Sequence, residues 1–184
     1  MGDITQLIQR ANAGDAGAVD HLFEALYPQL RQLARARLSP HVRDTLLDTT
    51  ALVHECYLKF VGAERLKPDS RGHFMAYAAS AMRSIIVDFA RAKRAERRGG
   101  DAAHVTLNTA LADALPGGED EILQVHEALQ DIAKLDPRLV QVVEMRYFGG
   151  MNDLEIAAAL GVTDRTVRRD WDKARLLLAA ALRR

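Results

Sequence analysis

The sequence predicts an all-α protein made of two small helical domains joined by a flexible linker. Apolar residues recur at spacings of three and four throughout, and no segment alternates as a strand would. Good helix formers, above all Ala, Leu and Arg, are abundant. A Gly- and Pro-containing stretch without a clear period separates the two helical parts. We therefore expect an N-terminal domain over residues 1–98, a linker over 99–120 and a C-terminal domain over 121–184.

Four segments of the N-terminal part have a helical apolar stripe. The first ends near the "NAGDAG" stretch, and the second reaches Ser39 and Pro40. The fourth is apolar early and basic late. The four segments span residues 4–8, 19–33, 52–60 and 74–94.

The C-terminal part contains strong helix-boundary signals. Asp136 can cap a helix, and a proline follows it at a position suited to the first helical turn. Asn152 and Glu155 have the spacing of a capping box, with Asn as the cap. Gly161 is expected to end that helix, and Thr163 to begin the last one.

The segment from Asn152 to Ala174 has the parts of a helix-turn-helix, whose C-terminal helix can enter a DNA groove. We expect an apolar set to be buried between its two helices: Leu154, Ile156, Ala157, Leu160, Val162, Val167 and Trp171. Charged residues should face outward near the start of the second helix: Asp164, Arg165, Arg168 and Arg169. The alternative is a solvated basic helix in a bundle.

A second basic cluster lies at residues 91–100 and continues a helix that carries Phe74 and Tyr77. Aromatic side chains beside a basic strip can stack unpaired bases while the cations hold the backbone. The alternative is that both aromatics belong to the core and that the basic end complements the helix dipole.

Together these clusters resemble bacterial sigma factors. Residues 144–182 are similar to the domain that recognises the −35 promoter element. The segments "DHLFEALYPQLRQLARARL", "LVHECYLKF" and "FMAYAASAMRSIIVDFARAKRAERR" are similar to the domain that recognises the −10 element. Nothing else of size remains, so the resemblance is to the small two-domain extracytoplasmic function (ECF) group. It implies a non-enzymatic protein that binds core RNA polymerase and promoter DNA.

The resemblance also implies roles for individual residues. The −35 element would be contacted by Thr163, Asp164, Arg165, Thr166, Arg168, Arg169 and Lys173. The −10 element would be contacted by Phe74, Tyr77, Arg83, Asp88, Arg91 and Arg94, although Ser84 replaces the usual Asn of that helix. The "KPDSRGH" loop would capture a flipped base. The linker, with Asp113, Glu119 and Asp120, would thread polymerase channels.

In the family, a segment corresponding to "DTTALV" docks on basic clamp helices of the largest polymerase subunit. Asp48, Thr49, Thr50 and Glu55 would form that surface here, with Thr50 and Ala51 in place of the usual Glu and Asp. Each lost charge-assisted hydrogen bond would cost on the order of 1.5–3 kcal/mol.

Because two carboxylates are missing, we expect a phosphate on Thr50, or on Thr49, to restore them, since it carries about −1.5 to −2 charges. The factor would then be activated by a Ser/Thr protein kinase; an anti-sigma factor is compatible with the sequence but is not indicated by it. The alternatives are that Asp48, Thr49 or Thr50 is a helix cap, or that other contacts supply the affinity.

Several function classes are disfavoured. His54 and Cys56 are two residues apart, so on a helix they point to different faces and cannot form a nucleophile pair. No metal-ligand spacing or phosphate loop is present, and we expect neither metal nor cofactor. Charge is balanced at 25 basic and 25 acidic residues, and no apolar run approaches the roughly 20 residues of a membrane span. We expect a cytoplasmic protein with no membrane partner.

Two other interpretations remain open. One is a helix-turn-helix regulator that binds duplex DNA independently of core polymerase. The other is an interaction protein that occupies the polymerase clamp as a decoy, against which the two basic clusters argue.

Overall fold

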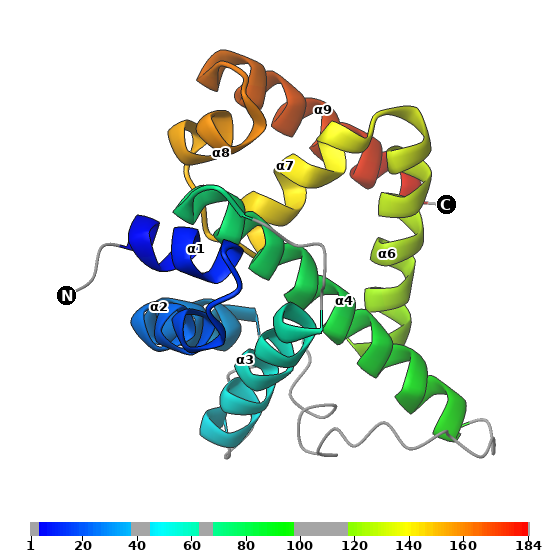
Figure 1. The fold of residues 1–184 in the computed structure, drawn as a ribbon. Coiled ribbons are helices and arrows are strands. Elements are labelled where there is room, and N and C mark those ends of the chain that lie inside the picture. The colour runs from blue at the N-terminus through cyan, green and yellow to red at the C-terminus, as the bar shows by residue number, and fades with distance from the viewer. Residues whose placement is uncertain (1–3, 38–44, 63–67, 98–117, 184) are drawn as a thin grey trace.

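The computed structural model describes residues 4–37, 45–62, 68–97 and 118–183, and all of its regular structure there is α-helical (Figure 1). The expected all-α fold is confirmed. The helices are α1 (Ile4–Asn12), α2 (Ala16–Arg37), α3 (Thr45–Val61), α4 (Arg71–Arg97), α6 (Gly118–Leu135), α7 (Pro137–Tyr147), α8 (Asp153–Leu160) and α9 (Asp164–Ala181). We call residues 4–97 the N-terminal half and residues 118–183 the C-terminal half. Most of the predicted linker lies outside the described residues.

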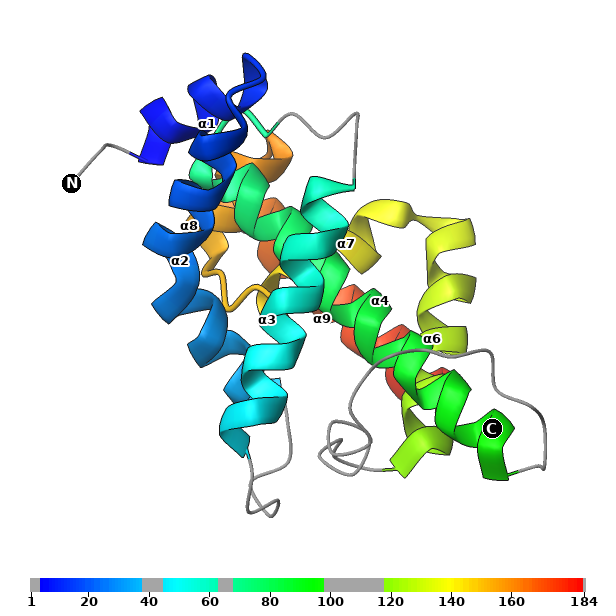
Figure 2. The ribbon, with the colours of Figure 1, turned by 60° about the horizontal axis from the view of Figure 1, so that its bottom comes forward.

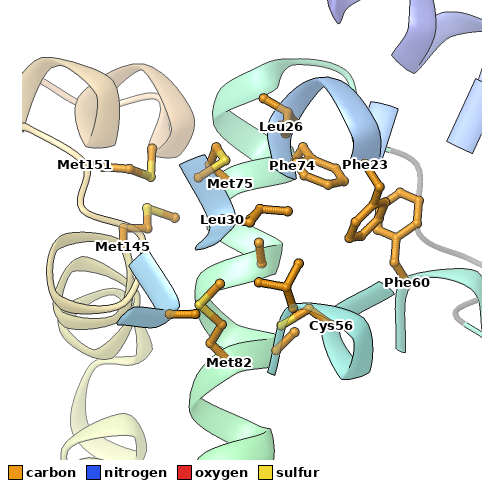
Figure 3. Packing of buried hydrophobic residues seen from close by; sticks show 14 of the residues in the cluster. Phe23, Leu26, Leu30, Cys56, Phe60, Phe74, Met75, Met82, Met145 and Met151 are labelled. Carbon is orange, nitrogen blue, oxygen red and sulfur yellow. The ribbon is translucent and has the colours of Figure 1, made fainter. Parts of the chain in front are cut away.

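The N-terminal half is built around an aromatic cluster. Phe23 of α2, Phe60 of α3 and Phe74 of α4 pack edge-on or tilted, with ring centroids 5.1 to 5.4 Å apart. Such pairs add directional packing energy to the burial of apolar surface. The three rings therefore fix α2 and α3 on one side of α4 (Figure 3).

The helix boundaries of the C-terminal half follow the local signals. The Asp136 side chain accepts from the Arg138 amide at 3.1 Å. The Asn152 side chain accepts from the Leu154 and Glu155 amides at 3.0 Å, and the Glu155 side chain accepts from the Asn152 amide at 2.9 Å. These contacts confirm the predicted caps, including the capping box.

The helix, turn and helix predicted over residues 152–174 are present as α8, a turn and α9. Gly161 ends α8 at a φ of +65°, a left-handed conformation in which glycine avoids the steric cost of a side chain. Thr163 caps α9 by accepting from the Thr166 amide at 3.2 Å. Ile156, Ala157 and Val167 are buried as expected.

The prediction that Leu154 is buried is wrong, because its side chain is 71% exposed. Leu154 lies in the first turn of α8, and its side chain faces solvent rather than α9. The helical period alone did not show where the buried stripe of this short helix begins.

The two halves pack against each other along α4. Figure 1 places α4 in the middle, with α2 and α3 on one side and α6, α7 and α9 on the other, and Figure 2 shows α2 and α6 on opposite sides of α4. One buried apolar cluster includes Met75 and Met82 of α4 together with Met145 and Met151 from the C-terminal half (Figure 3). We call these four residues the methionine seam.

The loop between α7 and α8 sits close to α2. Gly150 has a φ of +61°, and a Cβ added to it would lie 2.6 Å from Leu33 Cδ2. At the same place the Arg37 guanidinium lies 4.0 Å from the centroid of the Tyr147 ring, a cation–π contact between the halves. The contact between the halves therefore extends from α4 to the end of α2.

Candidate nucleic-acid interface

The start of α9 presents an exposed basic face. Arg165, Arg168 and Arg169 are exposed on it, as predicted from the helical spacing, and Lys173 is exposed as well. Thr163 is also exposed, whereas Asp164 and Thr166 are half-buried. A guanidinium on such a face can donate two parallel hydrogen bonds to guanine or to phosphate.

Carboxylates engage two arginines of this face: Arg169 Nη2 lies 3.5 Å from an Asp170 oxygen, and Arg168 has two acidic partners. Arg168 forms an ion pair with Asp164, and its Nε lies 3.3 Å from an Asp153 oxygen. Arg168 must leave these partners to contact DNA, whereas nothing in α8 or α9 holds Arg165 in this way. Arg168, which has two acidic partners, is therefore the most restrained cation of this face.

The rear of α9 is anchored by an ion pair between a buried carboxylate and a partly exposed arginine, which sequence patterns did not reveal. The Asp170 side chain is 4% exposed and accepts from Arg138 Nε at 2.7 Å. This pairing with Asp170 raises the pKa of Arg138. The pair fixes α9 on α7, and so sets the direction in which the basic face points.

The prediction of Phe74 as a base-contacting residue is wrong. Its side chain is fully buried, and its ring packs against Phe23 and Phe60. Tyr77 is half-buried, with its ring 5.6 Å from that of Phe60. The alternative of core aromatics therefore holds for Phe74, because α4 turns that position toward α2 and α3.

Arg83 lies at the contact between the halves. It forms an ion pair with Glu144 of α7, and each side chain is 13% exposed. A second guanidinium nitrogen, Nη2, lies 3.0 Å from Nδ1 of His126 on α6. In this arrangement α6 and α7 cover a side chain that was predicted to contact the −10 element.

The remaining −10 candidates are also engaged by polar partners. Arg91 Nη2 lies 3.1 Å from His126 Nε2, and Arg94 Nε lies 3.4 Å from an Asp120 oxygen. Asp88 is 3.4 Å from Lys59 Nζ within the N-terminal half. The structure thus gathers the basic residues of α4 on one strip, and the first turns of α6 face that strip.

His126 stands between two cations. Its pKa is lowered, first by burial and then by the charges of Arg83 and Arg91. A neutral imidazole has one donor and one acceptor nitrogen, so it accepts from only one of the two guanidinium groups at a time. The neutral form of His126 therefore suits this contact, and the protonated form opposes it.

The loop before α4 faces the C-terminal half. His73 Nδ1 contacts Asp69, and its Nε2 lies 2.8 Å from the Ala159 carbonyl oxygen of α8. The hydrogen bond to Ala159 and the neighbouring Asp69 raise the pKa of His73. The loop predicted to capture a flipped base thus contacts α8 through His73.

The predicted docking segment forms part of α3. Thr50 is exposed, and Glu55 is half-buried one turn later. The backbone of Asp48 lies in α3, but its side chain is outside the described part of the structure. Thr49 is 1% exposed, so its prediction as a docking and phosphorylation residue is wrong for this arrangement.

The structure gives no support to a catalytic site around Cys56. Its thiol is buried, and burial raises its pKa to about 12. Within the described residues, no group of three or more His, Cys, Asp or Glu side chains is placed to hold a metal. Nor does any described helix have the length and apolar character needed to cross a bilayer.

The fold is all-α among the described residues, and basic side chains gather on α4 and at the start of α9. The family model described as "ECF sigma factor" matches residues 1–184, and the chain belongs to the ECF sigma factor family. A search of solved structures finds CnrH in complex with the cytosolic domain of CnrY, at 22% identity and a TM-score of 0.45. That match covers 98% of this chain and 97% of the other. No curated protein matches the chain.

Proposed function

We propose that the protein binds core RNA polymerase and directs it to promoters, with α9 reading the −35 element and α4 opening the −10 element. The family match over the whole chain carries this proposal. The exposed arginines at the start of α9 support it, because a recognition helix contacts bases and phosphates from its N-terminal turns. We expect the protein to act in the cytoplasm, where core polymerase and promoters are found.

The two halves would have to separate before α4 could hold DNA. Arg83, Arg91 and Arg94 contact α6 or α7, so the structure corresponds to a closed form in which this strip is covered. The domain division at residues 98 and 120 fits such a motion, because the segment between α4 and α6 would act as the tether. Polymerase would bind the open form and shift the population toward it.

We further infer that phosphorylation of Thr50 strengthens docking on the polymerase clamp. Thr50 is exposed on α3, at a position where the family usually has a carboxylate. A phosphate would add negative charge and strong acceptor oxygens for basic groups on the partner. Thr49 is buried, so Thr50 is the residue that a Ser/Thr kinase would reach.

Run-off transcription with purified core polymerase tests both the sigma role and its activation by phosphorylation of Thr50. Wild type, Thr50→Glu, Thr50→Ala and protein phosphorylated by a co-expressed kinase would be compared. Gln124→Glu, on the exposed side of α6, is the matched control because it adds the same charge away from the docking segment. We expect promoter-specific transcripts from the phosphorylated and Thr50→Glu forms, and few from wild type or either of the other two variants.

The outcomes separate the sigma role from its activation by phosphorylation. Full activity of unmodified wild type would refute the phosphorylation switch and leave the sigma role intact. Specific binding to duplex DNA, with no transcription by any form with core polymerase, would favour a helix-turn-helix regulator that acts without the polymerase.

A further inference from the structure

The closed form contains a cavity between its two halves. Its volume is about 380 Å³, near the lower end of the roughly 300–1,000 Å³ of small-molecule sites. Ile86 and Val87 of α4 line one side, and Leu129, Val143 and Trp171 line the other. The cavity exists as a single space only while α4 packs against α6 and α7, whose arrangement Figure 1 shows.

Most of the cavity wall is apolar. Phe148 and Leu178 extend the apolar lining, and Val125 stands at its edge with 37% of its surface exposed. An apolar wall of this size favours a chain of carbon atoms or a small ring system over a polar metabolite.

Charged and polar side chains interrupt this apolar wall: Glu121 and His126 line it, and so do two arginines with unsatisfied donors. Arg37 and Arg83 both line the cavity, and in each the buried Nε has no hydrogen-bond partner among the described residues. Glu144 contacts the Nη1 atom of Arg83 and His126 its Nη2, whereas the Nε hydrogen has no partner among the described residues. A buried donor without a partner is unfavourable, and a ligand acceptor would relieve the cost.

We propose that this cavity binds an apolar carboxylic acid, with the carboxylate on Arg37 and Arg83 and the hydrocarbon part against α6, α7 and α9. A carboxylate accepts at two oxygens and matches the fork of a guanidinium, and such charge-assisted hydrogen bonds are the strong ones. A cationic amine would meet like charge, and an alcohol would not supply the charge-assisted hydrogen bonds.

Binding would hold the two halves together. Residues from both halves form the wall, so the ligand binds the closed form and stabilises it by mass action. An apolar acid would therefore inhibit transcription by competing with the opening that polymerase requires. This last consequence rests on the proposed sigma function, whereas the binding site itself does not.

Trp171 provides the test, because it is the single tryptophan of the chain and lines the cavity. Its fluorescence would be titrated with decanoate below the concentration at which decanoate forms micelles. Decan-1-ol and decylamine are the matched neutral and cationic probes. We expect a saturable change with decanoate, and binding of the other two probes weaker by about tenfold or more, the value of a charge-assisted contact.

Two variants locate the site, and a third controls for them. Val125→Phe should fill the cavity and abolish the decanoate response, whereas Leu176→Phe, on an exposed position of α9 outside the lining, should retain it. Arg37→Gln should weaken decanoate binding about tenfold and leave decan-1-ol unchanged. Arg37→Gln keeps the site testable should Val125→Phe fail to fold.

The proposal is overturned if decanoate gives no saturable response, or if decan-1-ol binds equally well. A response that survives both Val125→Phe and Arg37→Gln would place the ligand elsewhere and overturn it too. These outcomes need no polymerase, so they are independent of the sigma assignment. Decanoate binding without any effect on transcription would retain the site and refute its inhibitory role.

Discussion

Replacing Glu144 with Gln should loosen the contact between the two halves. Glu144 and Arg83 form an ion pair in which each side chain is only 13% exposed. Gln keeps the shape and one acceptor oxygen but leaves the guanidinium without its counter-charge. Removing one partner of a fully buried pair costs about 3–5 kcal/mol, and a hydrogen bond to a charged group is worth about 1.5–3 kcal/mol. Because Gln still accepts and some solvent reaches the pair, we expect a loss of about 2 kcal/mol, or roughly 30-fold in the opening equilibrium.

Thiol labelling can measure this opening. Val87 of α4 is 4% exposed and packs against Leu123 of α6, so Val87→Cys would place a thiol that reacts only when α6 moves away. The native Cys56 gives little background, because it is buried and burial raises its pKa to about 12. In the Val87→Cys protein, Glu144→Gln should raise the labelling rate about 30-fold if labelling follows the opening equilibrium.

Asp153→Asn is the matched control. Asp153 pairs with Arg146 and Arg168 inside the C-terminal half, so the variant removes the same charge without touching α4. Its labelling rate should equal that of the parent. Equal rates for Glu144→Gln and Asp153→Asn would refute the conclusion that the Glu144 pair holds the halves together.

Three further predictions follow from individual side chains. The rate of thiol labelling at the α4–α6 contact should rise as pH falls below about 6.5, because burial and then two arginine charges lower the pKa of His126 in the closed form, so that protonation favours the open form. The rise should be smaller in His126→Gln. Asp170→Asn should lower the free energy of unfolding by about 1–3 kcal/mol in denaturant titrations, whereas Asp172→Asn, at an exposed site, should not. Arg165→Ala should weaken binding to the −35 element by about 1–3 kcal/mol, seen as a loss of −35-dependent transcription, whereas Arg175→Ala, further along α9, should have little effect.

Each of these predictions has a result that contradicts it. For His126, the test is the difference between wild type and variant, since the raised pKa of His73 favours closure at low pH and partly offsets the acid response. Parallel acid responses of the two proteins would exclude a role for His126. Equal unfolding midpoints for Asp170→Asn and Asp172→Asn would show that the buried pair contributes no stability. Unchanged promoter preference in Arg165→Ala would exclude that residue from the recognition face.

Local signals predicted much of the fold. The Asp136 cap, the Asn152–Glu155 capping box and the Gly161 turn are each set by residues within a few positions of one another, and all three were predicted correctly. The same local logic placed Arg165 and its neighbours on the outer face of α9.

Long-range pairing accounts for what the sequence did not show. Nothing within one helix indicates that Arg83 meets Glu144, which is 61 residues away, or that Asp170 meets Arg138. Phe74 was assigned to DNA because its position matched a family pattern, yet its ring is buried against the rings of Phe23 and Phe60 from two other helices. Periodicity predicts that a residue lies on an apolar face, but not which partner covers that face.

The methionine seam has a consequence for how often the two halves can part and meet again. Met75, Met82, Met145 and Met151 are unbranched, with several rotatable bonds and a soft sulfur atom, so they fill a gap without demanding one interlocking fit. Branched side chains at this contact would pack well only if the two halves met in one alignment each time they closed. Methionine side chains can pack even when the two halves meet in slightly different alignments, but oxidation to sulfoxides would make them polar and weaken the contact. The reversibility of closure is thus tied to the redox state of four sulfur atoms.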